Sequence, residues 1–220
     1  MLFPIVFTDL DGTLLDHRDY SFDAAQQALN TLQKKNIPII FNTSKTELES
    51  LAIARKIGLA NPVIVENGGA IIIPRNYDFS DPSNPSNTWR SGASTVVLGV
   101  KLQVIQQTLG EANAKLEIAT DYQTFSSMSG AEIQASTGLD SAGAELAKQR
   151  QYSEPLIWRG NKEKLTRLQA FLVEHGLRLV EGGRFHHVVG LSNKCTAMVR
   201  LVQMYEDGAN GSRKTCIIAL

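Results

Sequence analysis

The amino-acid sequence predicts an α/β protein: a doubly wound parallel sheet into which a second α/β domain is inserted. Three short apolar runs near the N-terminus each end in polar residues, and helical patterns lie between them. This alternation is typical of a parallel sheet that is covered by helices. After a long block of less regular pattern, the chain returns to a helix and an apolar strand. We therefore expect a core domain over residues 1–80 and 190–220 and an inserted domain over residues 81–189.

The elements of the first half follow from their periodicity. The first apolar run begins at Pro4 and is rich in strand-forming residues, the pattern of a strand buried on both faces. Ser21 can cap a first helix, whose inward side chains recur at helical spacing: Phe22, Ala25, Ala28, Leu29 and Leu32. Residues 37–41 predict a second strand, a helix then runs to about Ile57 and stops at Gly58, and residues 62–65 predict a third strand.

The second half begins with residues 76–89, where Asp, Ser, Asn and Pro predict a surface loop. Within the inserted block, the patterns predict helices over 102–112, 141–150 and 162–175, strands over 116–119 and 156–158, and a hairpin of 177–180 with 185–189. The core resumes with a helix over 193–205 and a strand over 216–220.

Composition limits the class of protein. The 220 residues are 43% hydrophobic and hold 22 basic and 22 acidic side chains, enough for one large domain or two small ones. The balanced charge gives no reason to expect nucleic acid or an anionic membrane as a partner. Cys195 and Cys216 are too few for a disulfide framework and are expected to be small buried side chains. Because Asp9 interrupts the first apolar run, we expect no signal peptide or membrane span, and a cytoplasmic protein.

Two carboxylates directly follow the first strand. Asp9 and Asp11 are separated by one residue, so an extended chain would direct both side chains to the same face. They would then emerge together at the carboxyl end of the strand, where open α/β sheets bind their ligands. Two like charges at so short a separation have a high electrostatic free energy unless a cation or a shared proton relieves the repulsion. Mg2+ suits such oxygen ligands. Asp-Gly also marks ordinary turns, which is the alternative interpretation.

The stretch Asp9-Leu10-Asp11-Gly12-Thr13-Leu14 resembles the first signature of the haloacid dehalogenase (HAD) superfamily, whose members are mostly Mg2+-dependent phosphatases. This resemblance implies that Asp9 is the nucleophile and forms an aspartyl phosphate. It implies that Asp11 protonates the leaving oxygen and later activates water. Asp9 and the backbone carbonyl of Asp11 would be metal ligands. The inserted block is similar to the α/β cap domain of type IIB members.

The resemblance assigns roles to two further positions. Thr43, at the end of the second predicted strand, would donate a hydrogen bond to a phosphoryl oxygen, with Ser44 as the alternative. Lys194, just inside the helix that follows the inserted block, would offset the negative charge of the nucleophile and the phosphoryl group. A plain helix cap and a solvated surface lysine are the competing interpretations.

Shorter motifs resemble one subgroup, the mannosyl-3-phosphoglycerate phosphatases and their close relatives. They are residues 42–46, 66–69, 153–155 and 182–185. The implied substrate is a small phosphorylated sugar or glycerate, bound by Ser44, Lys45, Glu66, Asn67, Gly68 and Arg184. Arg184, with Arg150 or Arg159, would bind the glycerate carboxylate, because a guanidinium matches a carboxylate with two hydrogen bonds. A phosphosugar mutase and a non-catalytic module that binds a phosphorylated ligand remain alternatives.

The sequence departs from the superfamily at one signature. An acidic cluster of the form Gly-Asp-x-x-x-Asp is expected after the last core strand, and none occurs in the 220 residues. Glu206 and Asp207 precede that strand instead. We therefore expect a shortened form with an incomplete metal shell and weak Mg2+ dependence. We also expect the apolar edge at residues 215–220 to favour self-association. No oligomeric state follows from these patterns.

Overall fold

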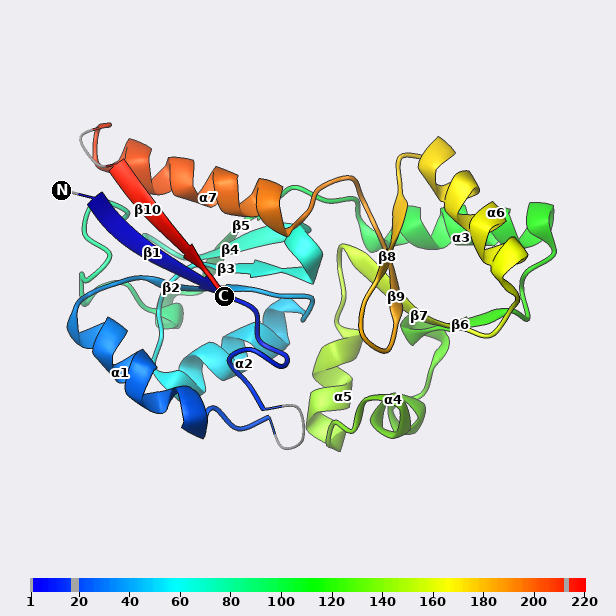
Figure 1. Ribbon diagram of the computed structural model, residues 1–220, viewed down its shortest axis with the longest axis horizontal. Helices are drawn as coiled ribbons and strands as arrows, with labels where there is room; N and C mark the ends of the chain where they lie inside the picture. Colours follow the sequence, from blue (N-terminus) through cyan, green and yellow to red (C-terminus); the bar gives the residue numbers. More distant parts are fainter. Residues whose placement is uncertain (1, 17–19, 212–213) are drawn as a thin grey trace. The chain divides into compact units, whose positions relative to one another are not determined.

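The computed structural model describes residues 2–16, 20–211 and 214–220. The chain divides into two compact units: Met1–Leu98 with Lys194–Leu220, and Gly99–Asn193 (Figure 1). The sequence had placed these divisions near residues 80 and 190. The first division lies later because β5 (Ala93–Val97) pairs with β4 (Ala70–Pro74) in the sheet of the first unit.

The first unit is built on a six-stranded sheet with the order β10-β1-β2-β3-β4-β5. Four strands of this sheet run parallel and were predicted from sequence, whereas β4 and β5 extend it in antiparallel pairing. The four parallel strands are β1 (Leu2–Thr8), β2 (Ile39–Asn42), β3 (Val63–Val65) and β10 (Lys214–Ala219). The predicted α/β class with a parallel-sheet core is confirmed.

Helices cover both faces of this sheet. Helix α7 (Lys194–Gly208) lies on one side, and α1 (Gln26–Lys34) and α2 (Glu47–Ile57) lie on the other (Figure 1). The α7 side holds a core of buried apolar side chains from the sheet and the helix, among them Ile5, Phe7, Ile40, Ile64, Leu201 and Tyr205. Burial of each such side chain contributes about 1.5–3 kcal/mol. The core therefore fixes β1 and α7 relative to each other.

Local signals explain the limits of α2. Thr46 caps its start: the Thr46 hydroxyl accepts from Glu49 N–H, and the Glu49 carboxylate accepts from Thr46 N–H. Gly58 ends the helix with φ 78°, a left-handed conformation that suits glycine. Helix α1 begins later than predicted. A short 3-10 turn over Asp23–Ala25 precedes it, and the carbonyl of Ser21 accepts from Asp16 N–H.

The second unit is a four-stranded antiparallel sheet with the order β6-β7-β9-β8. The strands are β6 (Tyr122–Thr124), β7 (Ser153–Trp158), β8 (Arg178–Glu181) and β9 (His186–Val189). Helices α3 (Leu102–Leu116) and α6 (Lys162–Glu174) share one hydrophobic core with this sheet. Helices α4 (Gly130–Thr137) and α5 (Ser141–Lys148) contribute Ile133 and Ala144 to a second apolar cluster. The predicted hairpin of β8 and β9 is confirmed.

Two further sequence predictions were wrong. Residues 116–119 form no strand: α3 continues to Leu116, Glu117 takes a left-handed φ of 54°, and Ile118 is fully buried at the turn that follows. Two apolar residues separated by one position, as Leu116 and Ile118 are, fit the end of a helix as well as a strand. Cys195 and Cys216 are both exposed rather than buried.

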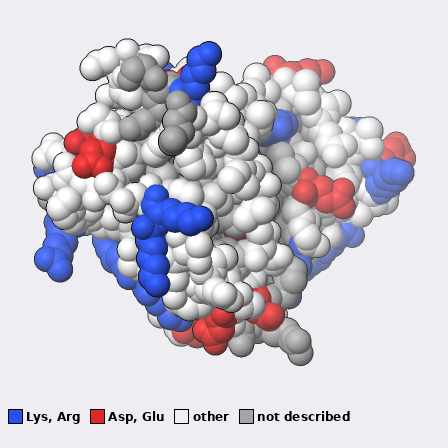
Figure 2. All heavy atoms as spheres, turned by 60° about the vertical axis from the view of Figure 1, so that its left-hand side comes forward, with Lys and Arg blue, Asp and Glu red and all other residues white. Residues whose placement is uncertain are grey.

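Charge and hydropathy at the surface agree with the balanced composition. On the face drawn in Figure 2, basic and acidic side chains are both spread among broad areas of other residues. Within the part of the chain that the structure describes, no helix is both long and apolar enough to cross a lipid bilayer.

Candidate active site

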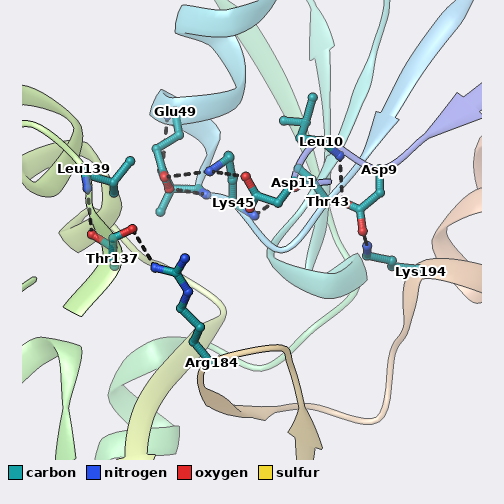
Figure 3. Close-up of polar contacts among 11 residues, drawn as sticks. Asp9, Leu10, Asp11, Thr43, Lys45, Glu49, Thr137, Leu139, Arg184 and Lys194 are labelled. Carbon is teal, nitrogen blue, oxygen red and sulfur yellow. Dashed lines mark hydrogen bonds and ion pairs between the residues drawn. The ribbon is translucent and has the colours of Figure 1, made fainter. Parts of the chain in front are cut away.

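The candidate site of the first unit lies where β1, β2 and β3 end and α7 begins. Asp9 follows β1, Asn42 ends β2, Glu66 follows β3, and Lys194 opens α7. The carboxyl ends of parallel strands meet at one edge of a sheet, which is where open α/β sheets place ligands. Figure 3 shows Asp9 and Lys194 pointing toward one another at this edge.

Both carboxylate oxygens of Asp9 are held. Asp9 Oδ1 accepts from Leu10 N–H at 2.7 Å, and Asp9 Oδ2 lies 2.5 Å from Lys194 Nζ. About a third of each charged side chain is exposed, 36% for Asp9 and 34% for Lys194. The neighbouring Leu10 is fully buried and anchors the backbone between Asp9 and Asp11. Asp9 is therefore fixed in direction and still open to a ligand.

Asp11 lies beyond the strand rather than on it. Strand β1 stops at Thr8, and residues 10–15 form a tight turn in which Gly12 N–H donates to the Leu15 carbonyl. The strand alternation on which the sequence prediction rested therefore does not apply at Asp11. Instead its carboxylate is held by another segment, with Asp11 Oδ1 2.9 Å from Lys45 Nζ (Figure 3).

Lys45 joins two carboxylates. Its ammonium group also lies 3.7 Å from Glu49 Oε1, and the Lys45 and Glu49 side chains are only 9% and 8% exposed. Burial alone would lower the pKa of Lys45, but the carboxylates of Glu49 and Asp11 outweigh it and raise that pKa. Lys45 therefore stays charged. The Tyr20 ring, 5.1 Å from the ammonium nitrogen, adds a cation–π contact.

The segment after β2 offers hydroxyl and amide groups. Thr43 is fully buried, and its hydroxyl oxygen accepts from Lys45 N–H at 3.2 Å, which leaves the hydroxyl hydrogen to donate. Ser44 is half-buried in the same turn. Asn42 Nδ2 donates to the Lys194 carbonyl at 3.4 Å, so the end of β2 helps to hold the start of α7.

The segment after β3 has an unusual backbone. Glu66, Asn67 and Gly68 have φ values of 49°, 59° and 88°, and Glu66 is only 1% exposed. A left-handed conformation costs a non-glycine residue about 1–2 kcal/mol, so the surrounding structure must stabilise it. Glu66 N–H donates to the Lys45 carbonyl and Asn67 N–H to the Thr43 carbonyl, each at 3.0 Å. These bonds bring the predicted residues 43–45 and 66–68 together.

The arginines proposed for carboxylate binding lie in the second unit. Arg184 is exposed at the turn between β8 and β9, and its guanidinium donates to the Thr137 carbonyl at 3.0 Å. Arg150 donates to Ser153 Oγ at 2.9 Å. Arg159 donates to Gln123 Oε1 at 3.1 Å. The three guanidinium groups therefore have different partners within this unit.

The fit of the site to a metal ion follows from charge and donor count. Among the described residues, no group of three or more His, Cys, Asp or Glu side chains is placed to hold a metal. Mg2+, however, is often bound by one or two carboxylates together with water and substrate phosphate. Asp9 supplies such a carboxylate. The two ammonium groups already face the carboxyl groups of Asp9, Asp11 and Glu49, so they leave no net positive charge for a dianionic phosphate. These residues fit a Mg2+ ion that shares the phosphate.

Two residues of the site were missed in the sequence. Glu49 received no role in the site, because it is one of several polar residues in a predicted helix. Two signals indicated its position: it lies four residues after Lys45, and it completes a capping box with Thr46. Asn42 was noted within its motif but received no role. Its contact to Lys194 spans 152 positions in the chain, and local pattern carries no sign of it.

Comparisons with known proteins agree with this geometry. A family model described as haloacid dehalogenase-like hydrolase matches residues 6–86. A glucosyl-3-phosphoglycerate/mannosyl-3-phosphoglycerate phosphatase from Persephonella marina is 34% identical over 200 residues, which are 90% of this chain and 71% of that protein. A phosphatase of the same name from Methanococcoides burtonii is 34% identical over 208 residues, 92% of this chain and 73% of that protein.

A solved structure supports the fold. The HAD subclass IIB sugar phosphatase BT4131 matches with a TM-score of 0.61, covering 91% of this chain and 75% of its own. Its sequence is only 11% identical, so the match concerns the fold alone.

Proposed function

This chain belongs to the haloacid dehalogenase-like hydrolases, and from this premise we propose that it is a Mg2+-dependent phosphatase of glucosyl- or mannosyl-3-phosphoglycerate. The observation that carries the proposal is Asp9, held between the Leu10 N–H and the Lys194 ammonium at the carboxyl end of β1. The substrate class comes from the names of the two relatives. The family resemblance inferred from residues 9–14 is confirmed.

In the first step, an Asp9 carboxylate oxygen attacks the phosphorus atom. A P–O bond forms to Asp9, the ester P–O bond breaks, and the leaving oxygen takes a proton from the Asp11 carboxyl group. Lys194 offsets negative charge at the nucleophile and the phosphoryl group, and the Thr43 hydroxyl donates to a phosphoryl oxygen. Mg2+, held by Asp9 and the Asp11 carbonyl, would supply positive charge to the phosphoryl oxygens.

In the second step, water attacks the phosphorus atom of the aspartyl phosphate. Asp11, now a carboxylate, accepts a proton from that water, and the P–O bond to Asp9 breaks to release inorganic phosphate. Asp9 returns as a carboxylate and Asp11 as a carboxylic acid. Each residue therefore ends the cycle as it began.

Similarity to the relatives implies further residues that bind substrate. In the first unit these are Ser44 and the segment Glu66, Asn67 and Gly68; the bonds from Glu66 N–H to the Lys45 carbonyl and from Asn67 N–H to the Thr43 carbonyl join this segment to the turn after β2. Arg184, from the second unit, supplies a guanidinium for the glycerate carboxylate. Its present partner is a backbone carbonyl, a neutral acceptor that a carboxylate can replace.

The test is a comparison of substrates. Release of inorganic phosphate is measured from mannosyl- and glucosyl-3-phosphoglycerate and from a panel of sugar phosphates, each with and without added Mg2+. We expect Mg2+-dependent release with the highest kcat/KM on one of the two phosphoglycerates. Equal rates across the panel would refute the substrate but not the chemistry. An isomeric sugar phosphate in place of inorganic phosphate, or binding without turnover, would refute the hydrolase.

A further inference from the structure

We propose that Lys45 and Glu49 are positioning residues for the acid–base carboxylate Asp11, rather than groups that bind substrate. The proposal rests on the proposed function, since it concerns the same reaction. Its basis is the continuous contact from Glu49 through Lys45 to Asp11, with 3.7 Å and 2.9 Å between the charged atoms (Figure 3).

Asp11 needs such support because its side chain is exposed in a turn. It lies past the end of β1, in the turn of residues 10–15, and its side chain is 41% exposed. A short side chain in an exposed turn can adopt several rotamers. Proton transfer requires one geometry, with the carboxyl oxygen within hydrogen-bond distance of the leaving oxygen. A displacement of about 1 Å can slow a reaction about 100-fold.

Lys45 is placed to fix that geometry. Its side chain is 9% exposed, and its backbone N–H donates to Thr43 Oγ1, so both ends of the residue are held. An ammonium group donates to a carboxylate and also to the carbonyl oxygen of a protonated carboxyl group. The contact therefore serves Asp11 in both steps of the cycle. A lysine already shared by two carboxylates is a poor candidate for binding a third anion.

Glu49 holds Lys45 from the other side. Its carboxylate is fixed to the start of α2, where Glu49 Oε2 accepts from Thr46 N–H and from the Thr46 hydroxyl, each at 2.9 Å. The other oxygen, Oε1, faces Lys45. Glu49 thus ties the first turn of α2 to the position of the Asp11 carboxylate.

The experiment compares two esters that differ in leaving group but hardly in size. Phenyl phosphate needs a proton donor for its leaving oxygen, whereas p-nitrophenyl phosphate, with a more acidic phenol, needs one much less. The measured quantity is kcat/KM, which covers only the steps up to departure of the phenol. In Lys45→Met we expect a loss of about 10- to 100-fold on phenyl phosphate and of less than about 3-fold on p-nitrophenyl phosphate.

Three further variants sharpen the test. Lys45→Arg keeps the cation and should restore much of the rate on phenyl phosphate. Glu49→Gln retains the helix cap, since glutamine also completes a capping box. It should lose less kcat/KM than Lys45→Met, and again more on phenyl phosphate than on p-nitrophenyl phosphate. Lys164→Met removes a comparable ion pair, with Asp121 at 2.7 Å in the second unit. It should leave the ratio of the kcat/KM values on the two esters unchanged.

The outcomes separate the hypotheses. An equal loss on both esters in Lys45→Met would show that Lys45 binds the phosphoryl group, and no loss on either would show that it has no role in the reaction. Either result overturns the positioning proposal. If Lys45→Met does not fold, the ratio of the kcat/KM values on the two esters in Glu49→Gln decides. A ratio equal to that of the unsubstituted protein overturns the positioning proposal. Failure of the unsubstituted protein to hydrolyse either ester would instead refute the phosphatase function.

Discussion

Substitution of Lys194 by methionine should separate catalysis from stability. Lys194 Nζ lies 2.5 Å from Asp9 Oδ2, and about a third of each side chain is exposed. Methionine keeps much of the length of the side chain and removes only the charge. The remaining contacts of the segment persist, including the bond from Asn42 Nδ2 to the backbone carbonyl of residue 194.

The expected magnitudes differ strongly. An ion pair with this exposure contributes about 0–1 kcal/mol to folding, because water screens the charges and the lysine loses conformational freedom. A donor aimed at the charge that develops in the transition state contributes far more, about 2.7–4 kcal/mol or a factor of about 100 to 1,000 in kcat. We therefore expect a folded protein with almost no turnover.

The assay measures kcat by phosphate release and the free energy of unfolding by urea denaturation, in Lys194→Met and the unsubstituted protein. Lys164→Met is the matched control, because the Lys164 side chain is also 34% exposed and its ion pair spans 2.7 Å. A loss of kcat below about 3-fold in Lys194→Met, equal to that of the control, would refute the role of Lys194. It would then be a solvated surface lysine.

Three other predictions test the site and the fold. Asp9→Asn should abolish turnover with little change in the free energy of unfolding, because the side chain keeps its size but loses the nucleophile; normal turnover in a folded variant would refute the assignment. Gly58→Ala should lower the free energy of unfolding by about 1 kcal/mol, because φ is 78° and no atom lies within 4 Å of the added carbon, so only backbone strain acts; an unchanged urea midpoint would contradict this. Glu154 is 1% exposed, and burial raises its pKa above 4.5. Its contribution to stability is thus present below that value and is lost as the pH rises through the raised pKa, so Glu154→Gln should flatten the decline of the urea-measured stability as the pH rises above 4.5; identical slopes would contradict this.

Local pattern was sufficient for much of the fold. The limits of α2 follow from Thr46, Glu49 and Gly58, whose capping and stop signals lie within a few residues of the helix ends. Asp9 could be placed because a buried apolar strand leads directly into it. In both cases the deciding residues lie close together in the sequence.

Other features depend on contacts between distant segments. Strand β4 follows a turn in which Glu66, Asn67 and Gly68 all have positive φ. Asn-Gly between two apolar runs is a hairpin signal, but residues 66–69 were interpreted only as a ligand-binding motif, so the reversal was missed. Strand β5 lies beyond the loop of residues 76–89, so its pairing with β4 was missed. The contact between Lys45 and Asp11 likewise arises only when β1 and α2 are in place.

The most direct test of the account is a pre-steady-state measurement on the Asp11→Asn variant with p-nitrophenyl phosphate. This ester needs little acid catalysis, so Asp9 should still be phosphorylated rapidly, whereas water attack on the aspartyl phosphate should be slow without the base. We predict a burst of nitrophenolate approaching one per protein molecule, with phosphate found on Asp9 by peptide mapping after acid quench. A linear time course from the first turnover, with no phosphate on Asp9, would contradict the account.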